Sequence, residues 1–80
     1  MRGSSARHRI RAAAAGSKAW TPLGGAGPLH DDFRHSQGWL LQLAYTEHGE
    51  IASASLGRWE PNGTPSENLA AVLRVLAEVK

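Results

Sequence analysis

The sequence predicts a small α+β protein: a ββα unit, made of an antiparallel hairpin and a C-terminal amphipathic helix, behind a largely irregular basic N-terminal arm. Two patterns carry this prediction. From Trp39 onward, large apolar residues alternate with smaller or polar ones, which is the period of a half-buried strand. A helix-capping sequence at Thr64 then precedes apolar residues spaced as on one face of a helix.

Residues 1–18 are predicted to be a basic, disordered arm. This segment has no acidic residue and few large apolar ones, so it buries too little surface to offset the entropy lost on ordering. Ser5 and Gly16 would suit the two ends of a short helix through the alanine run between them. A helix of that length is marginal in water, so we expect it to form only against a partner.

Residues 19–38 are predicted to be a Gly/Pro-rich connection that packs only in part. Its glycines and prolines interrupt any regular periodicity, which is typical of irregular structure. We expect its bulky apolar residues to fold back over one face of the hairpin. These are Trp20, Leu23, Leu29 and Phe33.

Residues 39–80 are predicted to be the folded ββα module, with a turn at 47–50 between its two strands. One face of the hairpin then matches large apolar residues on the first strand with small ones on the second. The predicted cross-strand pairs are Tyr45 with Ala52, Leu43 with Ala54, Leu41 with Leu56, and Trp39 with Arg58. The last pair would bring a guanidinium onto an indole ring at the open end of the hairpin.

The helix start is marked by Thr64 as N-cap, Pro65 at the first helical position and Glu67 reaching back. The apolar arc of this helix is wider than the stripe of about 100° on an ordinary surface helix. The hairpin alone cannot cover it, so we expect residues 20–33, a second copy of the chain or another protein to pack there. The predicted partner interface consists of Val72, Val75, Leu76 and Val79.

Charge divides the chain into two unlike halves. Residues 1–38 carry six basic and two acidic residues, a net charge of +4. Residues 39–80 carry three basic and five acidic residues, a net charge of −2, so the whole chain has a net charge of +2. A basic arm can contact phosphates without sequence preference, here through Arg7, Arg9, Arg11 and Lys18. A passive solubilising tail and an Arg-rich organellar presequence are the alternative interpretations.

No motif specifies a reaction. His30, Asp32 and His35 offer metal-ligating atoms, but their spacing fits no standard site, and the chain has no cysteine. The glycines of 24–27 lack the flanking strand, helix and lysine or serine of a phosphate-binding loop. We therefore expect no metal, no cofactor and no enzymatic activity.

The sequence favours a small non-enzymatic binding or regulatory protein that acts through protein–protein association of its ββα module, with a homodimer as the expected assembly. The alternative is a nucleic-acid-binding accessory protein that uses the basic arm. The apolar stretches are too short to span a bilayer, and we find no secretory signal. We therefore expect a cytoplasmic protein without a membrane partner, or an organellar one in a eukaryote.

Overall fold

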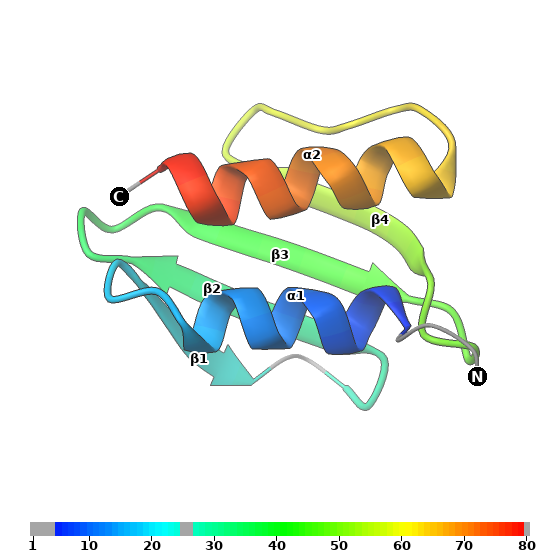
Figure 1. Ribbon diagram of the computed structural model, residues 1–80, viewed down its shortest axis with the longest axis horizontal. Coiled ribbons are helices and arrows are strands. Elements are labelled where there is room, and N and C mark those ends of the chain that lie inside the picture. The colour runs from blue at the N-terminus through cyan, green and yellow to red at the C-terminus, as the bar shows by residue number, and fades with distance from the viewer. Residues whose placement is uncertain (1–4, 25–26, 80) are drawn as a thin grey trace.

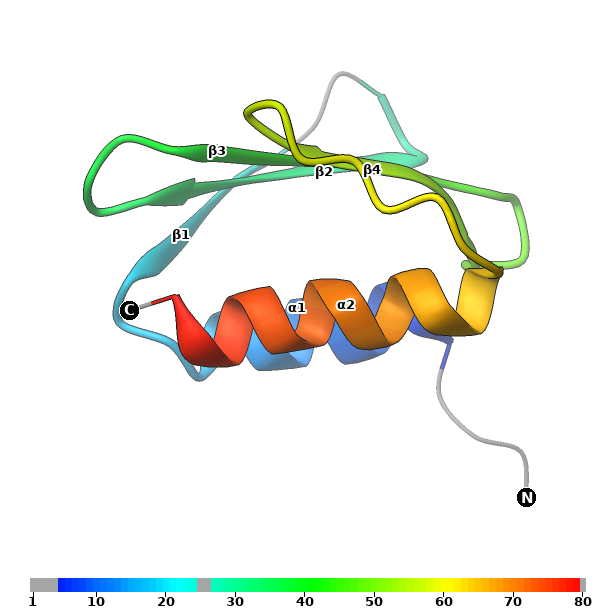
Figure 2. The same cartoon turned by 90° about the horizontal axis from the view of Figure 1, so that it is seen from above.

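The computed structural model describes residues 5–24 and 27–79, so residues 1–4 of the predicted arm and part of the glycine-rich segment 24–27 lie outside it (Figure 1). The elements are α1 (Ala6–Ala15), β1 (Trp20–Gly24), β2 (His30–His35), β3 (Leu40–Tyr45), β4 (Ile51–Leu56) and α2 (Pro65–Glu78). The four strands form one antiparallel sheet in the order β1-β2-β3-β4. Figure 2 shows both helices on the same face of this sheet, which gives two layers.

The predicted α+β class is confirmed by this sheet and its two helices. The finer prediction, a ββα unit behind an irregular basic arm, needs correction. Residues 6–38 supply a helix and two strands, so β3, β4 and α2 form only part of a continuous two-layer structure. In the part of the chain that the structure describes, neither helix is both long and apolar enough to cross a bilayer.

Helix α1 occupies residues that were predicted to be disordered. Ser5 caps it, accepting a hydrogen bond from the backbone N–H of His8 at 3.2 Å. Ala6, Ile10 and Ala14 recur at intervals of four residues and are almost completely buried. This stripe of mostly small side chains packs into the core, and the burial supplies the stabilisation that an isolated short helix lacks.

The start of α1 is also tied to the turn between β3 and β4. The backbone N–H of Arg7 donates to the carbonyl of Gly49 at 2.9 Å. Gly49 has a φ of +81°, and a Cβ atom there would lie 2.9 Å from the Cβ of Ser5. Glycine is therefore required at this turn both for its backbone conformation and for the close approach of the helix.

Strands β1 and β2 replace the irregular connection predicted for residues 19–38. They pair antiparallel with Trp20 opposite His35, and the register shifts between Pro22 and Gly24. Proline cannot donate a hydrogen bond to a sheet, but β1 is an edge strand, where a missing N–H can face outward.

The apolar residues of this part of the chain divide between core and surface. Trp20 and Phe33 are buried, but they lie in strands that extend the sheet beside β3 and do not fold back over a face of the hairpin as predicted. Leu23 and Leu29 are exposed. The indole N–H of Trp20 donates to the carbonyl of Val79 at 3.0 Å. This bond joins the edge strand to the end of α2.

The register of the β3–β4 hairpin agrees with the prediction at its centre and differs at both ends. The predicted pairs Leu41–Leu56 and Leu43–Ala54 are present. Near the turn, a register shift beside Ala44 makes Tyr45 pair with Ile51 instead of Ala52. Such a shift inserts one unpaired residue and bends the strand locally.

The predicted pairing of Trp39 with Arg58 does not form, because β4 ends at Leu56. The chain turns sharply at Gly57, whose φ of +58° favours glycine. Trp59 then returns to exchange two backbone hydrogen bonds of 2.9 Å with Leu56. Arg58 is left exposed at the tip of this turn.

Helix α2 begins as predicted, with a complete capping box. The Thr64 hydroxyl accepts from the Glu67 N–H at 3.2 Å, and the Glu67 carboxylate accepts from the Thr64 N–H at 2.8 Å. The hydrogen bond from the Thr64 backbone, followed by its side-chain bond, holds the pKa of Glu67 below its ordinary value. Pro65 occupies the first turn, where its missing N–H costs nothing.

We expect Thr64→Ala to lower the free energy of unfolding by about 1 kcal/mol, because it leaves the Glu67 N–H without its acceptor. Urea unfolding followed by circular dichroism measures the loss. Thr64→Ser keeps the hydroxyl and serves as the control. A loss of equal size in both variants would show that the hydroxyl is not the stabilising group.

Candidate functional site

The residues predicted to form a partner interface on α2 lie mostly inside the molecule. Val72 and Leu76 are buried in the core, and Val75 and Val79 are partly buried against it. The wide apolar arc of α2 is covered by the sheet and by α1, which runs beside it (Figures 1 and 2). Val72 and Leu76 therefore offer no surface to a partner, whereas Val75 and Val79 keep part of theirs.

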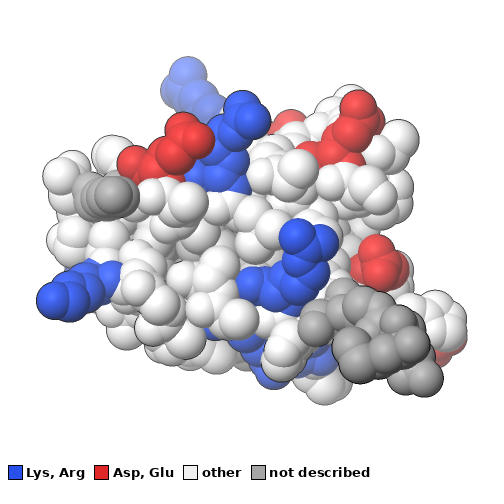
Figure 3. All heavy atoms as spheres, in the orientation of Figure 1, with Lys and Arg blue, Asp and Glu red and all other residues white. Residues whose placement is uncertain are grey.

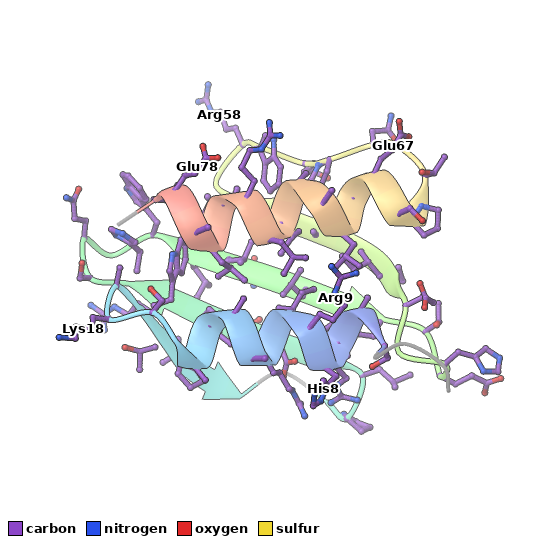
Figure 4. All side chains as sticks on the ribbon, in the orientation of Figure 1. His8, Arg9, Lys18, Arg58, Glu67 and Glu78 are labelled. Atoms are coloured by element: carbon purple, nitrogen blue, oxygen red, sulfur yellow. The ribbon has the colours of Figure 1, made fainter. Side chains whose placement is uncertain are left out.

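The basic residues of the predicted arm do not gather on one surface. Arg7 and Arg11 turn toward Asp31 of β2, whereas Figure 4 shows Arg9 between the two helices and Lys18 at the far end of α1. Figure 3 shows the basic side chains on the helix side of the molecule spread out and interspersed with acidic ones. This distribution does not make the continuous positive track that phosphate backbones require.

Asp31 is the centre of a polar cluster between α1 and the sheet. Nε and Nη2 of Arg11 donate to its two carboxylate oxygens at 2.8 and 2.9 Å, and Nε of Arg7 lies 3.9 Å from Oδ2. Burial alone would raise the pKa of Asp31. The hydrogen bonds from Arg11, the nearby Tyr45 and the charges of both arginines outweigh it, so this pKa lies below its ordinary value.

Tyr45 completes the cluster. The guanidinium carbon of Arg7 lies 5.2 Å from the centre of the Tyr45 ring, within cation–π range. Burial and then the neighbouring Asp31 raise the pKa of the Tyr45 hydroxyl, which stays protonated at neutral pH. The cluster thus joins α1 to β2 and β3, so Arg7 and Arg11 have a structural role.

The three residues considered as metal ligands point to opposite sides of β2. His30 and Asp32 line a shallow polar hollow on the sheet face away from the helices, while His35 is buried on the helix side. Within residues 5–24 and 27–79, no three or more His, Asp or Glu side chains gather in a way that could hold a metal ion.

His35 is the centre of an aromatic stack that the sequence did not reveal. Its ring meets Trp20 edge-on, with centroids 4.9 Å apart, and lies flat against Trp39 at 4.8 Å. Its Nδ1 accepts the backbone N–H of Gln37 at 3.1 Å. Trp39 therefore covers His35 with one face while 47% of its own surface stays exposed.

Beside this stack, an apolar hollow of about 350 Å³ opens at the end of the sheet. We call it the Trp39 surface. It is lined by Trp39, Leu40, Leu56 and Gly57. Two exposed arginines adjoin it: Arg34 is the cross-strand partner of Leu40, and Arg58 directly follows Gly57.

The sheet face opposite the helices is mostly polar. Figure 2 shows that neither helix covers it. Its central hollow is lined by His30, Asp32, Gln42, Leu43, Ala44, Ser53 and Ser55. A polar sheet face of this kind is commonly solvated, so the Trp39 surface is the stronger candidate for binding.

Comparison with protein-family models, with curated proteins and with solved structures finds no match to this chain.

Proposed function

We propose that this protein is a small non-enzymatic binding or regulatory protein that acts through protein–protein association, and that its association surface is the Trp39 surface. The observation that carries the proposal is the exposed indole of Trp39 beside the partly exposed Leu40 at a hollow. Tryptophan is enriched among the few residues that dominate binding energy at protein interfaces. A large side chain that is rigidly stacked on His35 loses little entropy on binding.

The nucleic-acid alternative has weaker support. Two of its four residues, Arg7 and Arg11, already bind or adjoin Asp31, and Arg9 and Lys18 lie apart from each other. Releasing Arg11 for a phosphate would leave the buried Asp31 without its main partner, which costs free energy.

The proposal is tested by retention of proteins from the source cells on the immobilised wild type, Trp39→Ser and Leu23→Ser variants. Leu23 is as exposed as Trp39 but lies outside the hollow, so its replacement is the matched control. We expect a defined protein to be retained by the wild type and by Leu23→Ser and to be lost with Trp39→Ser. Leu40→Glu gives a second variant that leaves the cover of His35 in place.

Light scattering on the wild type, Trp39→Ser and Leu23→Ser proteins measures their molecular masses and so tests whether the partner is a second copy of the chain. Identical retained proteins and identical masses for all variants, each folded by circular dichroism, would contradict association through the Trp39 surface.

A further inference from the structure

Resting on this proposed function, we infer what the Trp39 surface binds: one apolar side chain of a partner protein, within an acidic segment whose carboxylates pair with Arg34 and Arg58. Three observations point to this partner: the size of the hollow, the charges around it, and the charges that a second copy of the chain would bring to it.

The size of the hollow suits a single anchoring side chain. Four residues line its volume of about 350 Å³. Stable dimers bury about 800 Å² on each partner and involve some 20 to 30 residues a side. A pocket of this size instead resembles the single anchor site around which a peptide segment binds.

The charged residues that directly neighbour the lining of the hollow, in the sheet or along the chain, are two arginines, Arg34 beside Leu40 and Arg58 beside Gly57, although neither lines the hollow itself. Arg34 and Arg58 are exposed, and neither takes part in any ion pair found among the described residues. Figure 4 shows Arg58 and Lys18 in the half of the molecule where the β2–β3 turn lies. The nearest acids in sequence, Asp32 and Glu60, are each two residues from an arginine, and the structure gives neither an ion pair with it.

Guanidinium groups bind carboxylates with two parallel hydrogen bonds, which adds specificity as well as affinity. An acidic segment would therefore gain from both arginines while its apolar side chain enters the hollow. A basic or neutral segment would leave the arginines with water only.

A second copy of this chain fits the surface less well. A twofold axis at Trp39 would bring Arg34 and Arg58 close to their own copies, and like charges across an interface oppose binding. The turn at residues 46–50 carries Glu47 and Glu50 but no large apolar side chain of its own. The exposed Leu29 lies beside it, because the N–H of Tyr45 donates to the Leu29 carbonyl, so the experiment also has to detect a head-to-tail second copy.

The experiment is an NMR titration of the full-length ¹⁵N-labelled protein with short synthetic peptides. The first peptide has a leucine between two pairs of glutamates. The others replace the glutamates with glutamines, replace the glutamates with lysines, or replace the leucine with alanine. We expect the acidic leucine peptide to shift the Trp39 indole and the amides of Leu40 and Gly57, and to bind about tenfold more tightly than the glutamine peptide in dilute salt.

The preference for the acidic peptide is expected to shrink at about 0.5 M salt, because exposed charges are screened. Arg34→Gln with Arg58→Gln is expected to remove this preference. Arg9→Gln changes another exposed arginine, which lies away from the hollow, and is expected to leave the preference unchanged.

Three results would overturn the inference. Equal binding of the glutamine and glutamate peptides at Trp39 would mean that charge does not select the partner, while association through the Trp39 surface would stand. Shifts of the Trp39 surface with protein concentration alone, together with a dimer mass, would make a second copy the occupant. No peptide-dependent shift at Trp39 would leave the retention experiment with Trp39→Ser as the separate test of the proposed function.

Discussion

Replacing Ile10 with alanine is expected to lower the free energy of unfolding by about 3 kcal/mol. Ile10 is fully buried and is the only large apolar side chain on α1. Its removal leaves a cavity between this helix and the rest of the core. A domain of this size is stabilised by only about 4 to 12 kcal/mol, so the loss is a large share of the total.

Leu23→Ala provides the matched control for Ile10→Ala. It removes an aliphatic side chain that is 54% exposed, so we expect a change within about 0.5 kcal/mol. Urea unfolding followed by tryptophan fluorescence measures both variants. Equal effects of the two substitutions would contradict the placement of α1 in the core.

The Asp31→Asn substitution is expected to lower the free energy of unfolding at neutral pH by about 2 kcal/mol. The charged carboxylate accepts two short hydrogen bonds from Arg11, and an amide can accept only weaker ones while its NH₂ group faces the guanidinium. Asp32→Asn changes the adjacent residue on the opposite face of β2, and we expect it to stay within about 0.5 kcal/mol of the wild type.

The effect of Asp31→Asn depends on pH in a defined direction. The pKa of Asp31 in the folded protein lies below its ordinary value of 3.8, so on acidification the unfolded chain binds the proton first. The stabilisation by this carboxylate is thus fully present above about pH 4 and is lost as the pH falls through the folded-state pKa. In unfolding curves measured between neutral and strongly acidic pH, the free energy of unfolding of the wild type should approach that of Asp31→Asn as the pH falls. A constant gap over this range would contradict the role of the ionised carboxylate.

The sequence predicted best those elements whose signals are local. The capping box at Thr64 and the alternation through Leu41 and Leu43 are each contained within a few residues, and both elements form as expected. The bulge near Tyr45 and the tight turn at Gly57 changed the ends of the hairpin, because register at an end depends on backbone geometry more than on alternation.

Helix α1 was predicted only as a helix that would form against a partner, because its buried side is made mainly of alanine. Ala6, Ile10 and Ala14 have the spacing of a helix face, and Ser5 is a suitable cap, so the signal was present. It was outweighed by the low stability of a short isolated helix, a criterion that does not count burial against a distant sheet.

Strands β1 and β2 were hidden by polar residues at core positions. In β2 the residues on the helix side are Asp31, Phe33 and His35, which do not look like an apolar alternation. Each polar one has a partner far away in sequence: Arg11 for Asp31 and Trp20 for His35. Such partners cannot be recognised before the topology is known.

The sequence indicated part of the candidate site but not its geometry. The wide apolar arc of α2 correctly indicated a missing cover, and α1 of the same chain contributes that cover. Leu40 was an apolar exception on the face predicted to be polar, and it lines the hollow beside Trp39. That exception was the available signal for the Trp39 surface, but the direction of the Trp39 ring depends on its stack with His35.

Amide hydrogen exchange along α1 tests the central structural claim, that residues 6–15 belong to the core. We expect the amides from Ile10 to Ala14 to exchange as slowly as those of β3, because both become accessible only when the whole molecule unfolds. Exchange of the α1 amides at the rate of an unstructured chain, with β3 still protected, would contradict the claim.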